Sequence, residues 1–72
     1  MTQRTVQVLQ FKDYTVKVTY DRDWEEYRAR LSVKGIPYEP ADCFDTNRES
    51  ILSTGKAMLD QAVQTNFQIP SN

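Results

Sequence analysis

The chain has 72 residues, of which 39% are hydrophobic and 26% are charged, and its formal net charge is −1. A chain of this length buries only about 60% of its unfolded surface, so we expect one small domain spanning residues 1–72. The near-neutral charge provides no overall field toward DNA or an anionic membrane, and no apolar run approaches the roughly 20 residues of a membrane span.

The first expected strand spans residues 5–11. Its apolar side chains point toward both faces, so either a bulge lies near Leu9 or both faces of the strand are partly covered. The polar pair Lys12 and Asp13 follows and suits a turn.

Two further strands are predicted at residues 14–20 and 27–33. Apolar and polar side chains alternate in both segments, which is typical of strands with one buried face. The charged segment 21–26 between them suits a turn. The side chains expected to face the core are Tyr14, Val16, Val18, Tyr20, Tyr27, Ala29, Leu31 and Val33.

A fourth strand is expected at residues 36–44. Lys34 and Gly35 allow a tight reversal before it, because glycine accepts a positive φ at little cost. Pro37 and Pro40 each lack an amide donor, so this segment is predicted to be an edge or an irregular strand.

One helix follows the strands and extends to about Val63. Thr46 is the predicted N-cap, with Glu49 as its capping-box partner. The apolar face of the helix consists of Ile51, Leu52, Gly55, Met58, Leu59, Ala62 and Val63. Because Gly55 lies in the middle of this face, we expect the helix backbone to approach the sheet closely there.

The order of these elements predicts an α+β fold of two layers. A three- or four-stranded antiparallel sheet would carry the single C-terminal helix packed on one face. Loose ends are expected near residues 1–4 and 65–72.

Strand alternation places Lys17, Arg28 and Arg30 on the sheet face away from the helix, with Lys34 at its edge. One interpretation is a contact surface for phosphates or for an acidic protein. The other is a solvated face on which Glu39 and Asp21 act as cross-strand partners of the cations. The sequence favours the solvated face.

The aromatic side chains also allow two interpretations. Trp24 lies in the charged turn, where it would either anchor a partner or fold back over the end of the sheet. We expect the packing role for Trp24, and we expect Phe44 in the core together with the tyrosines.

Histidine is absent and cysteine occurs once, as Cys43. Ser–His and Cys–His nucleophile systems and the usual zinc sites of a single chain are therefore excluded. We expect a non-enzymatic protein without a metal or cofactor, and Cys43 is expected to be a small buried hydrophobic residue. The N-terminus lacks the apolar segment of a signal peptide, so the expected location is the cytoplasm.

The segment 43–50 (CFDTNRES), following strands around Trp24 and Arg28, resembles two families. In AP2-type β-sheet DNA-binding domains, the sheet contacts the major groove through Arg and Trp side chains. That resemblance implies such roles for Arg28 and Arg30, and for Trp24 more loosely. The N-terminal domain of HicB-type antitoxins also has strands followed by a helix, and it binds a toxin. The small size is also similar to that of stand-alone phage or mobile-element proteins.

The resulting functional hypothesis is a small binding protein, a regulator, inhibitor or antitoxin-like chain, that contacts a macromolecular partner through its sheet face or edge strand. A protein partner is expected, and the alternative is nucleic-acid binding through Lys17, Arg28, Arg30 and Lys34. No membrane association is expected.

A homodimer is a further hypothesis, joined along or across residues 5–11, which carry neither proline nor charge. The alternative is a monomer in which Phe67 and Ile69 of the tail cover that strand.

Overall fold

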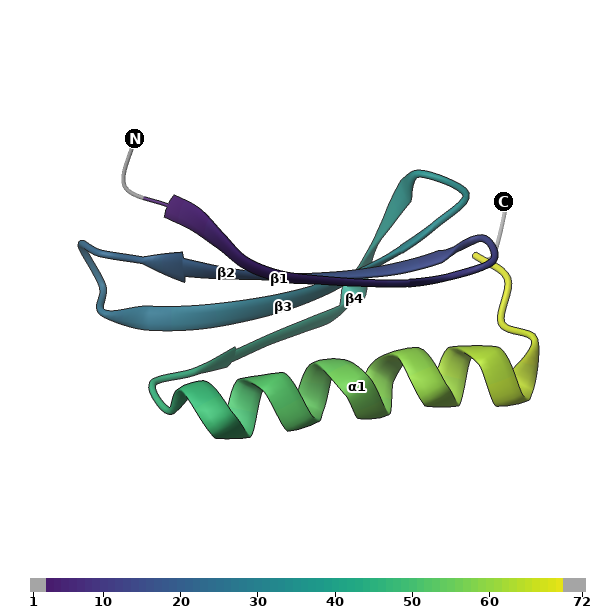
Figure 1. The fold of residues 1–72 in the computed structure, drawn as a ribbon. Coiled ribbons are helices and arrows are strands. Elements are labelled where there is room, and N and C mark those ends of the chain that lie inside the picture. The colour runs from purple at the N-terminus through teal and green to yellow at the C-terminus, as the bar shows by residue number, and fades with distance from the viewer. Residues whose placement is uncertain (1–2, 70–72) are drawn as a thin grey trace.

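The computed structural model describes residues 3–69 and places all four predicted strands ahead of the helix. The elements are β1 (Gln3–Phe11), β2 (Tyr14–Asp21), β3 (Glu26–Val33), β4 (Ile36–Asp45) and α1 (Arg48–Thr65). The strands form one antiparallel sheet in the order β1-β2-β3-β4. The helix lies across one face of this sheet (Figure 1). The predicted two-layer α+β fold is therefore confirmed, with four strands.

The ends of the chain are more ordered than the sequence predicted. Gln3 and Arg4 pair with β2, so β1 begins two residues before its expected start. At the other end, the helix stops at Asn66, whose φ of 51° is left-handed, and Phe67 donates its amide to the carbonyl of Ala62 at 3.0 Å. The remaining predicted loose ends, residues 1–2 and 70–72, lie outside the described residues.

The core lies between the helix and the inner face of β2 and β3. The buried side chains are Tyr14, Val16, Val18, Ala29, Leu31, Val33, Ile51 and Ala62. Each strand residue in this set was predicted from the alternation of its strand. In β1, the register shifts between Thr5 and Gln7, so Val6 and Leu9 both pack against the core.

Gly55 brings the helix backbone against the centre of the sheet. A Cβ atom built on Gly55 would lie 3.3 Å from Cγ1 of Val16 and 3.4 Å from Cγ2 of Val18. The Cβ of Ala29 would be 4.0 Å away. The predicted close approach is confirmed, because even one added methyl group would press on side chains that are themselves fully buried.

The start of the helix differs from the prediction by one residue. Asn47, not Thr46, is the N-cap, and its side-chain oxygen accepts the amide of Ser50 at 2.9 Å. The carboxylate of Asp45 in turn accepts the amide of Asn47 at 2.9 Å, which holds the turn before the helix. The predicted capping box of Thr46 and Glu49 is therefore wrong. Both Thr and Asn suit an N-cap, so residue type alone did not distinguish these two neighbours.

This cap predicts different costs for two adjacent substitutions. Asn47→Ala should lower the free energy of unfolding by about 1 kcal/mol, because the Ser50 amide loses its acceptor. Thr46→Ala should leave it within about 0.5 kcal/mol of the wild type, as for an ordinary surface substitution. Urea unfolding of both variants measures the difference. A larger loss of stability for Thr46→Ala than for Asn47→Ala would show that Thr46, and not Asn47, is the N-cap.

Candidate functional site

The sheet face away from α1, called the outer face below, gathers most of the predicted contact residues. In the sheet register, Lys17 lies opposite Arg30, and Thr19 lies opposite Arg28. Arg28 lies opposite Phe44 of β4. Lys34 lies in the turn between β3 and β4 and is exposed, and it does not line the hollows around Arg28. Four of the five predicted residues, Lys17, Trp24, Arg28 and Arg30, therefore line this one surface.

Arg28 is held by two neighbours from β4. Its Nε and Nη2 atoms donate to the two carboxylate oxygens of Asp42 at 2.7 and 2.5 Å. The guanidinium also lies over the ring of Phe44, with its central carbon 5.0 Å from the ring centroid. The expected partners Glu39 and Asp21 are therefore incorrect for Arg28. The paired carboxylate neutralises one of the three cations predicted on this face.

The ion pair predicts a pH dependence of stability. The charged hydrogen bonds from Arg28 lower the pKa of Asp42 below its ordinary value of 3.8. A lowered pKa means that this stabilisation is complete above the unfolded-state pKa and disappears as the pH falls through the folded-state pKa. Asp42→Asn should therefore cost up to about 1 kcal/mol at neutral pH and progressively less below about pH 4.

Chemical unfolding at a series of pH values measures this effect. Asp23→Asn is the control, because it removes an exposed carboxylate from the turn after β2 without touching Arg28. A cost of Asp42→Asn that stays constant down to strongly acidic pH would contradict the assigned ion pair.

Lys17 and Arg30 form a second feature of the outer face. They are directly opposite each other on β2 and β3, although like charges in this position repel. Within residues 3–69 the one ion pair is that of Arg28 with Asp42, so neither Lys17 nor Arg30 forms an ion pair of its own. Arg30 lies opposite Asp42 in the β3–β4 register, so the Asp42 carboxylate that pairs with Arg28 is also its neighbour. Lys17 is the cation of this face that an external anionic group would meet first.

Trp24 is exposed at the end of this face. Its side chain is 78% exposed, so the expectation that it folds back over the sheet is wrong. The turn is instead closed by Asp21, whose carboxylate accepts the amides of Asp23 at 2.9 Å and Trp24 at 3.4 Å. This local bonding fixes the backbone of the turn while leaving the indole in solvent.

Phe44 is the site residue that sequence reasoning missed. It was expected in the core but is 54% exposed and lies beside Arg28. In β4, Cys43 pairs with Ala29 and packs half-buried against the core, so its neighbour Phe44 must point to the outer face. The period of two along β4, counted from Cys43, could have indicated this orientation.

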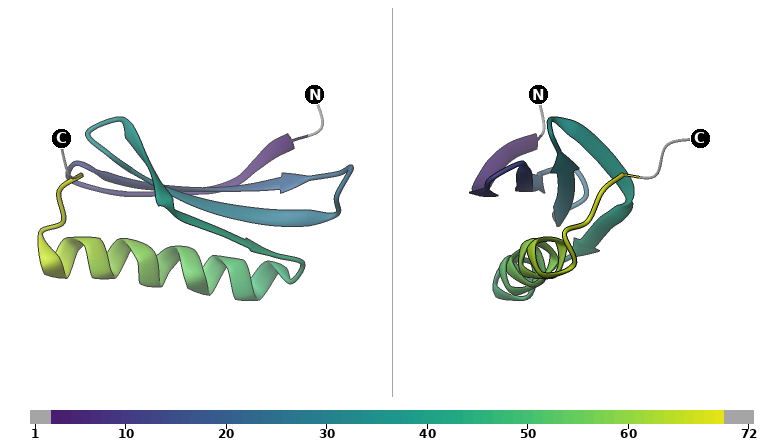
Figure 2. Two further views of the ribbon diagram at one scale, coloured as in Figure 1. Left: turned by 180° about the vertical axis from the view of Figure 1, so that it is seen from behind. Right: turned by 90° about the vertical axis from the view of Figure 1, so that its right-hand side faces the viewer.

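Two adjoining hollows give the outer face its shape. One of about 290 Å³ is lined by Gln3, Thr19, Asp21, Trp24, Glu26, Arg28 and Phe44. The other, of about 240 Å³, is lined by Gln3, Lys17, Thr19, Arg28, Arg30, Ser32 and Pro37. The start of β1 and the hairpin of β3 and β4 both curve away from the helix on either side of this face (Figure 2). The outer face is therefore concave, with Arg28 shared by both hollows.

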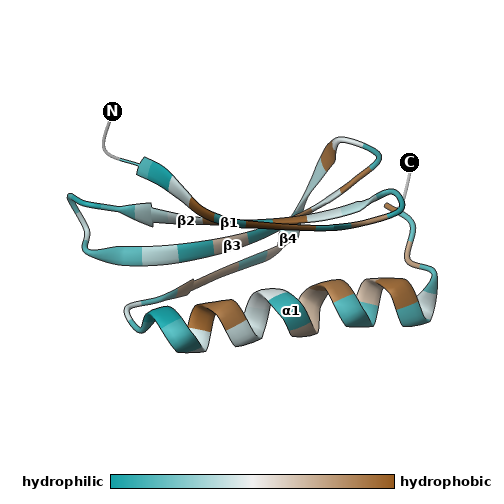
Figure 3. Ribbon diagram, in the orientation of Figure 1, coloured by the Kyte–Doolittle hydropathy of each residue, from teal (hydrophilic) through white to brown (hydrophobic). Residues whose placement is uncertain are grey.

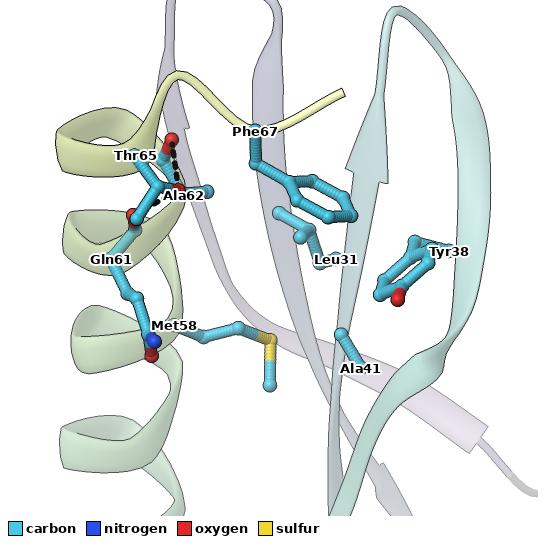
Figure 4. A pocket seen from close by; sticks show the side chains of 8 residues that line it. All are labelled: Leu31, Tyr38, Ala41, Met58, Gln61, Ala62, Thr65 and Phe67. Atoms are coloured by element: carbon cyan, nitrogen blue, oxygen red, sulfur yellow. Dashed lines mark hydrogen bonds between the residues drawn. The ribbon is translucent and has the colours of Figure 1, made fainter. Parts of the chain in front are cut away.

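A separate apolar hollow of about 200 Å³ lies between the helix end and β4 (Figure 4). Phe67 and Tyr38 meet across it with ring centroids 4.7 Å apart, and the side chain of Met58 extends toward it from the helix. Its lining includes no charged side chain, and the hydroxyl of Thr65 is already bonded to the carbonyl of Gln61 at 2.9 Å. The hollow offers apolar contact and little else to a ligand.

Comparison with protein-family models, with curated proteins and with solved structures found no match. Across residues 3–69, no helix has the length and apolar character needed to cross a membrane. The same residues contain no cluster of three or more Asp, Glu, Cys or His side chains arranged to hold a metal ion. The side chains that line the two hollows of the outer face are aromatic, cationic, acidic, hydroxyl and amide groups, together with Pro37.

Proposed function

We propose that this protein is a non-catalytic protein-binding module whose contact surface is the outer face of its sheet. The observation that carries the proposal is the exposure of Trp24 at 78% and Phe44 at 54%, which line one hollow together with Arg28. Trp and Arg are the side chains most enriched at the energetic centres of protein interfaces, and Phe is enriched in interfaces generally.

Charge supports a partner with acidic side chains beside its apolar contact. Lys17 and Arg30 face each other and neither forms an ion pair within the described residues, because the nearby Asp42 is bonded to Arg28, so an incoming carboxylate would relieve their repulsion. The resemblance to HicB-type antitoxins also favours a protein partner. We further propose a cytoplasmic location. The homodimer hypothesis concerns the backbone edge of β1 and is independent of binding at the outer face.

Nucleic-acid binding is the second candidate, and the Lys17–Arg30 pair is the observation that favours it. Its cationic surface is small, because Asp42 already neutralises Arg28. The acidic residues of the adjoining turn, Asp21, Asp23, Glu25 and Glu26, would also face a phosphate backbone approaching Trp24. A protein partner can place its acidic side chains at Lys17 and Arg30 and an uncharged surface at the turn, whereas a phosphate backbone is charged along its whole length.

Affinity capture from the native host, using the full chain as bait, tests the proposal. The wild-type chain should retain a specific protein, and the double variant Trp24→Ala, Phe44→Ala should lose it. Ile36→Ala is the matched control, because Ile36 is 58% exposed but lines neither hollow of the outer face. A partner retained by the double variant, or lost equally with Ile36→Ala, would refute the outer face as the contact surface.

Titration with duplex DNA and with RNA at two salt concentrations tests the second candidate function, nucleic-acid binding. Phosphate contacts give binding that weakens steeply with added salt. Tight, salt-sensitive binding that is abolished by Lys17→Glu would favour nucleic acid over the protein partner.

A further inference from the structure

β1 is the less protected of the two edges of the sheet. The other edge, β4, carries Pro37 and Pro40. Both edge strands contain one register shift, so only the prolines and charges distinguish them. β1 has nine residues, and its stretch from Thr5 to Phe11 contains no proline and no charge. Natural proteins protect edge strands with prolines and charged side chains, because the unpaired backbone groups of an edge can pair with a strand of another chain.

Apolar side chains accompany this open edge. Val8 is 52% exposed and Phe11 is 46% exposed, and the middle of β1 is coloured as hydrophobic in Figure 3. Beside Phe11 a hollow of about 420 Å³ opens toward the helix, lined by Gln10, Phe11, Leu59, Asp60, Val63 and Gln64. The edge therefore offers both backbone pairing and apolar area to a second strand.

Phe67 does not provide this cover. It packs on Tyr38 of β4, and its carbonyl accepts the hydroxyl of Tyr14 at 2.8 Å. The monomer alternative, in which Phe67 and Ile69 cover the first strand, is therefore wrong for Phe67, and Ile69 packs partly buried against the core. Val8 and Phe11 stay exposed with the tail in this position, so a cover for the β1 edge would come from another chain.

We propose that this cover is a second copy of the same chain, paired antiparallel through β1 about a two-fold axis near the middle of the strand. An uncharged strand meets itself without like-charge contacts, and an antiparallel strand edge is complementary to its own copy. Recognition of a different chain would require discriminating side chains, which the residues from Thr5 to Gln10 do not supply.

The pair would have one continuous sheet of eight strands. An axis perpendicular to the sheet leaves both helices on one side and both outer faces on the other. The dimer would therefore present two copies of the proposed contact surface in the same direction. The dimer proposal does not depend on whether the outer face binds a partner.

Sedimentation equilibrium across the micromolar range tests the proposal. The wild-type chain should have the mass of two chains, and Val8→Lys should raise the dimer dissociation constant at least tenfold, because two like charges would approach each other near the axis. Ile36→Lys is the matched control, since Ile36 is equally exposed on the opposite edge, and it should leave the dimer intact. A wild-type monomer, or a dimer broken by Ile36→Lys and not by Val8→Lys, would overturn the proposal.

A cross-linking experiment locates the interface independently of dimer stability. In a Cys43→Ser background, Val8→Cys should form an interchain disulfide on mild oxidation, whereas Ile36→Cys should not. Cross-linking through Ile36→Cys alone would assign the interface to β4 and refute the role of β1.

Discussion

Gly55→Val should lower the free energy of unfolding by about 2–3 kcal/mol, the usual cost of forcing extra methyl groups into a packed core. The added Cβ alone would lie 3.3 Å from Val16 and 3.4 Å from Val18, and the two further methyl groups of valine would need space that these buried side chains occupy. Helix propensity acts in the opposite direction, because valine is a better helix former than glycine. Any decrease in the free energy of unfolding of Gly55→Val therefore reports the cost of packing the added side chain.

Two variants control this experiment. Gly55→Ala should be nearly neutral, since its better propensity of about 1 kcal/mol offsets a single tight contact. Ser53→Val places the same new side chain on the exposed surface of the helix and should change stability by less than about 0.5 kcal/mol. A loss below about 1 kcal/mol for Gly55→Val in denaturant melts would contradict the close packing.

Trp24→Ala should weaken binding to the captured partner about 30-fold, corresponding to the roughly 2 kcal/mol that defines an interface hot spot. Stability should hardly change, because the side chain of Trp24 is 78% exposed and the hydrogen bonds of its turn involve Asp21 and backbone amides. Isothermal titration of the wild type and the variant, with thermal unfolding alongside, separates the two effects.

Arg30→Ala and Ile36→Ala extend this comparison. Arg30→Ala should weaken binding less than Trp24→Ala and make it less sensitive to salt, because it removes a positive charge that forms no ion pair with the described residues of the free protein. Ile36→Ala should leave affinity unchanged. An equal loss for all three variants would indicate a general effect on the fold and not a local contact.

Strand alternation was sufficient to predict the two layers of the fold. Polar residues alternate with Val16, Val18, Ala29 and Leu31, and all four are buried. Gly55 in the apolar stripe correctly indicated close packing, because a glycine inside a helix is costly unless something approaches it.

The features that sequence reasoning missed depend on local geometry. The register shift between β3 and β4 displaces the residues around Pro40, and an alternation counted from the start of β4 then gives the wrong face for Phe44. The placement of Trp24 depends on hydrogen bonds that the amides of Asp23 and Trp24 donate to Asp21 within the turn, which no periodicity describes. Likewise, the turn before the cap depends on the hydrogen bond that the amide of Asn47 donates to Asp45.

The outer face is the part of the candidate site that the sequence outlined but did not complete. Alternation placed Lys17, Arg28 and Arg30 together, yet it gave no information on which cation would be neutralised. Asp42 lies directly opposite Arg30 in the register but forms its two-point ion pair with Arg28, which lies diagonally across from it. In the part of the chain that the structure describes, Lys17 and Arg30 are therefore left without an ion pair of their own.

Site-specific photo-cross-linking in the native host tests the outer-face proposal most directly. A photo-activatable residue would replace Trp24 or Phe44 in one set of chains, and Ser53 on the exposed side of the helix in the control. The proposed function predicts the same cross-linked protein from Trp24 and Phe44, and none from Ser53. Cross-linking of a protein only through position Ser53 would contradict the proposed function. Cross-linking of nucleic acid, and not of protein, through positions Trp24 and Phe44 would contradict it as well.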